Sequence, residues 1–273
     1  MNYQTFQPHT DIGFLVKCYW SLEVPAEVPA QKQRIVPDGC MEMIFILGDD
    51  IRRYTSDQQF IIQPRAIVVG QITEPFIIEP TGYVHCFAAR FYPYGFANLV
   101  DMPVKELANK ETPIADLFGE TTATRLEQQI IAAAGNEERI QILEAFFLDR
   151  FQHKSMIDSI VTNTIDALLA AKGSTPINTL LKNDPAKRRQ LERKFHKQVG
   201  LSPKQLGKII RLQAALKLLL SRQNESLTRI AYESEYFDQA HFIRDFKDFT
   251  GINPKDFLDN HNLALTSLFS KAD

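Results

Sequence analysis

Apolar residues change their spacing along the chain near residue 102. Before that point they form short runs bounded by Pro, Gly or polar clusters, and no βαβ rhythm is present. Such runs predict the strands of an antiparallel sandwich or a small barrel. The predicted strands are Met41–Leu47, Phe60–Ile62, Ala66–Val69, Phe76–Ile78 and Tyr83–Phe91.

After residue 102 the apolar positions recur at the spacing of helices. The predicted helices are Pro103–Ala108, Pro113–Phe118, Ala123–Ala134, Glu137–Phe151 and Met156–Ala171. The segment Lys172–Pro176 combines a helix stop with a helix start, which predicts a hinge. We therefore predict an α+β fold with a β sandwich or barrel-like domain at 1–101, a helical linker at 102–172, an all-α domain at 173–260 and a tail at 261–273.

The last domain contains an internal repeat. The segment 195–206 matches the segment 246–257 without a gap, and each copy carries an apolar stripe on one side of a predicted helix. Arg193 and Arg244 then fall on the exposed sides of the two helices. The identical pairs are Phe195/Phe246, Gly200/Gly251, Pro203/Pro254 and Lys204/Lys255.

A shorter helix and a turn precede the repeated helix in both copies. In the second copy the predicted helix is Ser226–Tyr232, the turn ends at Phe237, and Asp238 is the N-cap of a recognition helix from Gln239 to about Phe249. Two helices joined by a tight turn, the second exposing polar residues, are typical of the DNA-reading helix-turn-helix.

The first copy follows the same plan. Its short helix is predicted at Ile177–Leu181, its turn at Lys182–Ala186, and its recognition helix begins near Lys187. A long helix at Ile209–Leu220 connects the two units. The sequence thus predicts two helix-turn-helix units in one domain.

Positive charge is concentrated in one part of this domain. The segment 187–222 is rich in Lys and Arg and carries one acid, Glu192, although the whole chain has a net charge of −2. Such segregation predicts a surface that binds a polyanion, and a solvated helix face is the alternative.

The segments that carry the repeat also resemble a known family. The residues 189–195, 200–203, 230–231, 236–242 and 246–254 resemble the C-terminal domain of AraC/XylS-family transcription regulators over about 174–258. Two further segments, 36–45 and 91–96, resemble a cupin-like N-terminal domain that some members carry.

The resemblance implies which side chains read DNA bases. Arg suits guanine, Gln suits adenine and Glu suits the cytosine amino group. His241 has an alternative as a partly buried core residue, and Glu192 has one as a partner of Arg188 or His196. The implied base-reading residues are Arg188, Arg189, Glu192 and Arg193 in the first unit, and Gln239, His241 and Arg244 in the second.

Three positions depart from the family pattern. Pro185 and Glu235 stand where Gly is usual, and Ala240 offers only a contact to a thymine methyl group. The segment 223–257 is richer in acids than in bases, so we expect the second unit to bind phosphate weakly.

The front domain offers a place for an effector. A closed β domain can hold a small ligand among its inward side chains. Ordinary core packing is the alternative for the same residues, and assembly is the alternative role for the domain. The apolar helix that ends at Phe151 packs either on this domain or on a second subunit. The candidate lining residues are Trp20, Phe45, Phe87, Arg90 and Tyr92.

We expect no enzyme activity, no cofactor and no metal. His9 and His85 lie far apart without a His-x-His pattern, and the chain has no Gly-x-Ser-x-Gly, Walker or Gly-x-Gly-x-x-Gly motif. A DNA-repair enzyme would need a reactive cysteine in a positive setting. The cysteines instead lie in or beside apolar runs and lack CxxC spacing, as expected of reduced thiols: Cys18, Cys40 and Cys86.

We therefore expect a cytoplasmic transcription regulator whose two recognition helices enter successive major grooves of double-stranded DNA. RNA polymerase, a small-molecule effector and a second copy of the chain are further candidate partners, and no membrane partner is expected. The alternative is a metal-free small-molecule-binding protein whose helical tail contacts other proteins. That alternative leaves the positive segment 187–222 unused.

Overall fold

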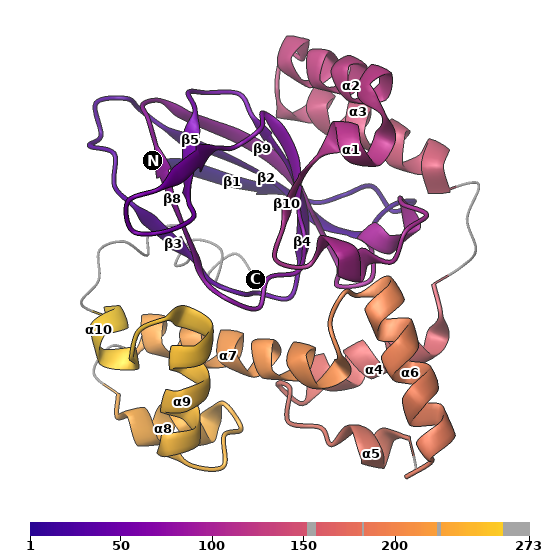
Figure 1. Cartoon of the computed structure of the whole chain (residues 1–273), viewed down its shortest axis with the longest axis vertical. Helices are drawn as coiled ribbons and strands as arrows, with labels where there is room; N and C mark the ends of the chain where they lie inside the picture. The colour runs from indigo at the N-terminus through magenta and orange to yellow at the C-terminus, as the bar shows by residue number, and fades with distance from the viewer. Residues whose placement is uncertain (152–156, 182, 223–224, 259–273) are drawn as a thin grey trace.

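The computed structural model describes residues 1–151, 157–181, 183–222 and 225–258. A β-rich front domain is followed by helices, and Figure 1 shows the sheets above the C-terminal helices. The predicted α+β class is confirmed. The predicted tail 261–273 lies outside the described residues.

The front domain consists of antiparallel strands in two sheets. The larger sheet has the order β1 (Asn2–Phe6), β2 (Val16–Val24), β9 (Val84–Phe91), β4 (Met41–Ile46), β7 (Ala66–Val69) and β10 (Glu111–Pro113). The smaller sheet has the order β3 (Gln33–Ile35), β8 (Phe76–Pro80), β5 (Ile51–Tyr54) and β6 (Phe60–Ile62).

The two faces of the larger sheet pack differently because neighbouring side chains along a strand point to opposite faces. On β9, Phe87 and Phe91 enter the main core, whereas Cys86 and Ala88 join a smaller apolar cluster with Ile51 of the other sheet. The main core is closed by η1 (Phe96–Asn98), η2 (Val104–Leu107), α1 (Ile114–Phe118), α2 (Glu120–Ala132) and α3 (Asn136–Phe151).

Helix α3 packs on the front domain, which was one of its two expected positions. Leu143 and Phe147 are fully buried in the main core, and the ring of Phe147 lies edge-on to Phe91, with centroids 5.3 Å apart. The apolar residues of this helix are therefore buried against the front domain of the same chain.

The C-terminal helices surround a second core. They are α4 (Ser159–Ala170), α5 (Ile177–Leu180), α6 (Pro185–Gln198), α7 (Pro203–Ser221), α8 (Leu227–Glu233), α9 (Gln239–Thr250) and α10 (Pro254–Leu258). Val161, Ile165 and Leu168 of α4 lie in this core, so α4 packs with the helix-turn-helix units rather than with the front domain.

Local sequence explains where the long helices begin. The carboxylate of Asp184 accepts hydrogen bonds from the backbone N–H groups of Ala186 and Lys187, so α6 begins at Pro185, earlier than predicted. Helix α7 also begins before the predicted Ile209, because Ser202 and Gln205 form a capping box. A proline in the first turn suits both helices, since no intrahelical hydrogen bond is lost there.

Candidate nucleic-acid interface and ligand cavity

Helices α6 and α9 lie at opposite ends of α7, as Figure 1 shows. On α6, Leu191 and Phe195 are fully buried. Arg189, Arg193 and Lys197 are exposed and spaced by four residues, so they form one column on the outer side. This column is an exposed positive face on the first recognition helix.

Helix α9 has the predicted cap and the predicted buried stripe. Asp238 accepts a hydrogen bond from the backbone N–H of His241, and Phe242 and Phe246 are fully buried. Arg244 is exposed on the outer side of the helix. The second recognition helix thus exposes Arg244 and Lys247 beside the acid Asp248, whereas the first presents a column of cations.

Two of the predicted base-reading side chains have contacts within the protein. The Gln239 side-chain oxygen accepts a hydrogen bond of 2.6 Å from the Thr228 hydroxyl. His241 has a side chain that is 38% exposed, and its Nε2 lies 3.4 Å from the buried carboxylate of Asp245. The DNA roles of these residues, and that of the half-buried Glu192, stay predictions.

The positive segment 187–222 does not form a single surface. Several of its cations bind partners that lie far away in the sequence, and the pattern of charges alone could not show these partners. Lys194 pairs with Asp158, Lys208 with Asp245 at 2.8 Å, and Arg222 with Glu233 at 2.7 Å, while Arg211 donates to the carbonyl of Gly173 at 2.8 Å. The exposed charge therefore concentrates on α6.

The two departures at usual glycine positions have different consequences. Glu235 has φ 64°, a left-handed conformation that favours glycine, so this residue is strained in the second turn. Pro185 is the first residue of α6, where its fixed φ suits the helix.

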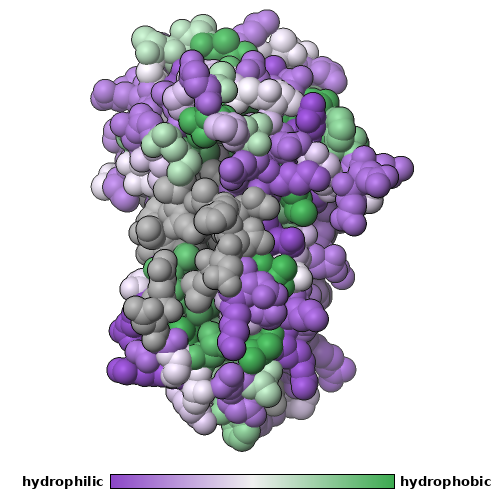
Figure 2. All heavy atoms as spheres, turned by 90° about the vertical axis from the view of Figure 1, so that its left-hand side faces the viewer, coloured by the Kyte–Doolittle hydropathy of each residue, from purple (hydrophilic) through white to green (hydrophobic). Residues whose placement is uncertain are grey.

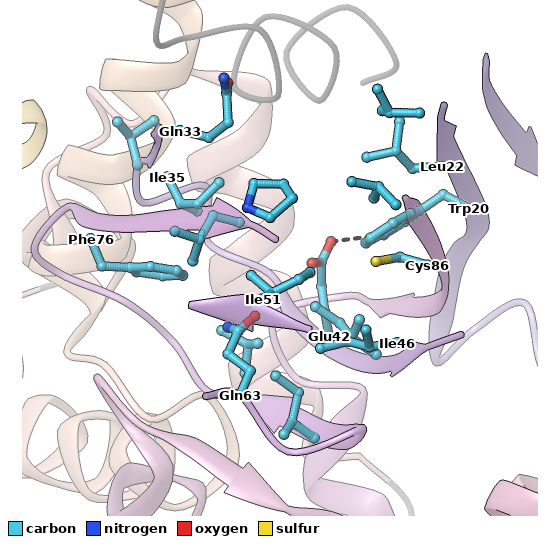
Figure 3. Close-up of a pocket in the computed structure, with 18 of the residues that line it drawn as sticks. Trp20, Leu22, Gln33, Ile35, Glu42, Ile46, Ile51, Gln63, Phe76 and Cys86 are labelled. Carbon is cyan, nitrogen blue, oxygen red and sulfur yellow. Dashed lines mark hydrogen bonds between the residues drawn. The ribbon is translucent and has the colours of Figure 1, made fainter. Parts of the chain in front are cut away.

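A cavity of about 360 Å³ lies between the two sheets of the front domain. Figure 3 shows Trp20, Ile46 and Cys86 on one side and Ile35 and Phe76 on the other. Most of its lining is aliphatic or aromatic, as is typical of sites for small molecules.

A polar cluster lies in the wall of this cavity. Glu42 accepts hydrogen bonds of 3.1 Å from the indole N–H of Trp20 and from Arg90. The second guanidinium nitrogen of Arg90 donates to Asp38 at 2.7 Å. Arg90 is almost completely buried, so these carboxylates compensate its charge inside the domain.

Trp20 and Arg90 of the predicted set line the cavity. Phe45 and Phe87 do not, because they lie on the opposite face of the larger sheet in the main core. Tyr92 follows the end of β9 and stacks on Tyr94, with ring centroids 5.9 Å apart. We therefore withdraw these three residues as candidate lining residues.

Sequence reasoning missed the other polar side chains of the lining, which are Gln31, Gln33, Asp38, Glu42, Gln63 and Gln213. The signal for Glu42 is its place in the apolar run of β4, where it shares a face with Ile44 and Ile46. Gln213 gives no comparable signal, because it comes from α7 in the other domain.

The side chain of Cys86 is buried beside the cavity. Burial raises the pKa of the Cys86 thiol to about 12. Among the described residues, no group of His, Cys, Asp and Glu side chains is arranged to hold a metal ion. No helix within the described ranges is long and apolar enough to cross a membrane.

Two separate regions of the chain match known domain families. Residues 4–113 match a family described as a domain of unknown function, DUF6597, and residues 186–260 match a helix-turn-helix domain. No curated protein matches the chain.

Solved structures of ToxT from Vibrio cholerae are similar to this chain. One is 12% identical, covers 86% of this chain and 98% of its own, and has a TM-score of 0.46. Another, from Vibrio cholerae O395, is 13% identical, covers 96% and 98%, and has a TM-score of 0.45. The chain therefore contains an N-terminal region that matches DUF6597 and a C-terminal region that matches a helix-turn-helix domain, a motif that binds DNA.

Proposed function

We propose that this chain is a cytoplasmic transcription regulator whose helices α6 and α9 enter two successive major grooves of duplex DNA. The observation that carries the proposal is the exposed column of Arg189, Arg193 and Lys197 on α6. In the helix-turn-helix motif, the second helix of the unit lies in the major groove. Helix α6 is the second helix of the first unit, and α9 is the second helix of the other.

The two helices contribute differently in this proposal. Helix α6 supplies most of the affinity, because its exposed cations can contact phosphates as well as bases. Helix α9 has fewer exposed cations and acids nearby, such as Asp248, so it mainly selects sequence. RNA polymerase and a second copy of the chain are the protein partners that we propose for the bound regulator.

The experiment is a titration of the full chain against a DNA duplex selected from a random pool, at several salt concentrations. With about four phosphates neutralised, the slope of log K against log salt is expected to be about −4. Lys197→Ala should make the slope less negative by about one, whereas Arg125→Ala, an exposed arginine on α2, should leave it unchanged. Affinity that does not change with salt would contradict the proposal.

We also propose that the cavity of the front domain binds a mainly apolar small molecule as an effector. The support is its volume of about 360 Å³ and its largely apolar walls with one polar cluster. Trp20 is the only tryptophan of the chain and lies in the wall, so its fluorescence reports on the cavity.

The uncharged dye N-phenyl-1-naphthylamine is a suitable probe for this cavity. Its binding should quench Trp20 and should be weakened by Ile46→Phe, which fills part of the space, but not by Ile131→Phe at an exposed site on α2. Binding of the dye without any binding of DNA would instead favour a small-molecule-binding protein whose helices contact other proteins.

A further inference from the structure

The segment Val36–Cys40 lies between the cavity and the DNA-binding helices. Val36, Asp38 and Cys40 line the cavity. The side chain of Val36 is also buried in the core that α4 to α10 surround. This short segment of the front domain therefore belongs to both parts of the molecule.

Helix α7 contacts the segment directly. The side-chain amide of Gln213 donates a hydrogen bond of 2.6 Å to the carbonyl oxygen of Pro37. Gly39 has φ 81°, and a Cβ atom at this position would lie 3.1 Å from Leu206 of α7. The backbone of the segment and helix α7 are thus packed so closely that one has little freedom to move without the other.

The cavity side of the segment is held by the polar cluster. The carboxylate of Asp38 accepts hydrogen bonds from Arg90 at 2.7 Å and from the backbone N–H of Cys40 at 2.8 Å. Arg90 also binds Glu42, which accepts the indole N–H of Trp20. A continuous path of hydrogen bonds and short backbone links runs from Trp20 in the cavity wall to Gln213 on α7.

Helix α7 connects the two helix-turn-helix units, so its position bears on both recognition helices. It contacts α6 and α9 as well as α8. A displacement of α7 relative to the front domain would change how α6 and α9 are presented to successive grooves. The two grooves are fixed by the geometry of the duplex, so DNA binding selects among positions of α7.

We propose that Val36–Cys40 is the coupling segment through which occupancy of the cavity changes the affinity for DNA. A molecule that contacts the Glu42–Arg90 pair changes the bond between Arg90 and Asp38, and the backbone at Pro37 then shifts against Gln213. This inference rests on the proposed function, because it needs both a cavity ligand and DNA binding. Since coupling between two binding equilibria is reciprocal, DNA must change the affinity of the cavity by the same factor.

The test measures the dissociation constant of N-phenyl-1-naphthylamine for the full chain with and without a selected DNA duplex, and the constant for DNA with and without the dye. For the natural sequence we expect both constants to change by one common factor of about five or more. If each dissociation constant is the same with and without the other ligand, the coupling is overturned while the proposed function still stands.

Two variants interrupt the path at different places. Asp38→Asn removes the charge that binds Arg90, and Gln213→Leu removes the donor to Pro37. Each variant should bring the coupling factor close to one, even if it changes the affinity for the dye alone or for DNA alone. The control Gln128→Leu, at an exposed position on α2, should keep the full factor.

The outcomes separate the two levels of the proposal. A full coupling factor in both Asp38→Asn and Gln213→Leu would overturn the role of the segment, because the coupling would then follow another route. Failure of the natural chain to bind either the dye or any DNA would overturn the proposed function and this inference together.

Discussion

The guanidinium of Arg34 in β3 donates a hydrogen bond of 3.2 Å to the backbone carbonyl of Thr250, the last residue of α9. A strand of the front domain thus binds the C-terminal end of the second recognition helix. A cation at this position also suits the negative end of the helix dipole. The end of the first recognition helix also lies close to η2, since a Cβ atom at Gly200 would be 3.2 Å from the carbonyl oxygen of Val104.

Replacing Arg34 should therefore affect the part of the DNA site that α9 contacts. We expect Arg34→Met to weaken protection of the distal half of a footprint while the proximal half stays protected. The reason is that α9 loses a contact that fixes its end relative to the front domain. Arg125→Met, at an exposed site on α2, is the control, and equal footprints for both variants would show that the Arg34 contact is not used.

Strain at Glu235 predicts a stabilising substitution. A left-handed backbone costs an ordinary residue about 1–2 kcal/mol, and glycine recovers most of this less its greater entropy in the unfolded chain. We expect Glu235→Gly to raise the free energy of unfolding by about 0.5–1 kcal/mol in denaturant titrations. Glu235→Ala, which removes the same side chain but keeps Cβ, should give no such gain.

The two exposed arginines of the recognition helices should differ in their contribution. Arg193→Ala removes one member of the column on α6, so we expect a loss of about 1–3 kcal/mol in binding free energy and weaker binding to every sequence. Arg244→Ala should mainly relax the base preference in the part of the DNA site that α9 contacts. Titrations of both variants against single-base mutants of one site, at one salt concentration, measure the difference. Equal losses on all sequences would contradict the asymmetry.

His9 connects the N-terminal region to α3. Its ring hydrogen-bonds to the carboxylate of Glu144, and this hydrogen bond together with the negative charge of Glu144 raises the pKa of His9 above its ordinary value of 6.5. The stabilising contribution is therefore complete below pH 6.5 and is lost as the pH rises through the raised pKa. An NMR titration should give a pKa above 6.5 for the natural chain and a value near 6.5 for Glu144→Gln.

Patterns of apolar residues predicted β4, β6, β7, β8, β9 and most helices. They missed β2, the longest strand among the described residues, and strands that few apolar residues mark, such as β1 and β5. β6 and β7 have the predicted bounds. β1 is largely exposed, and β5 combines Ile51 with two arginines, so neither stands out as an apolar run. These strands are defined by pairing with β2 and β8, and sequence spacing does not show which strands will pair.

For the candidate sites too, sequence patterns predicted some features and not others. The buried stripes and the outer arginines of α6 and α9 follow from helical periodicity, and the structure places them as that periodicity predicts. The cavity could not be predicted from periodicity. It lies between two sheets, and the sequence spacing does not show how two sheets pack against each other. Phe45 is close to Glu42 in the sequence, but the alternation of side chains along β4 places them on opposite faces.

The burial of Val36 among the C-terminal helices limits how this protein can be dissected or recombined. A fragment that begins at the predicted hinge near 172 would lack both Val36 and helix α4, leaving an apolar gap beside α7. We expect such a fragment to be less stable than its helix content suggests. A chimera with the front domain of another regulator would need a matching side chain at this point, so the halves are not exchangeable modules.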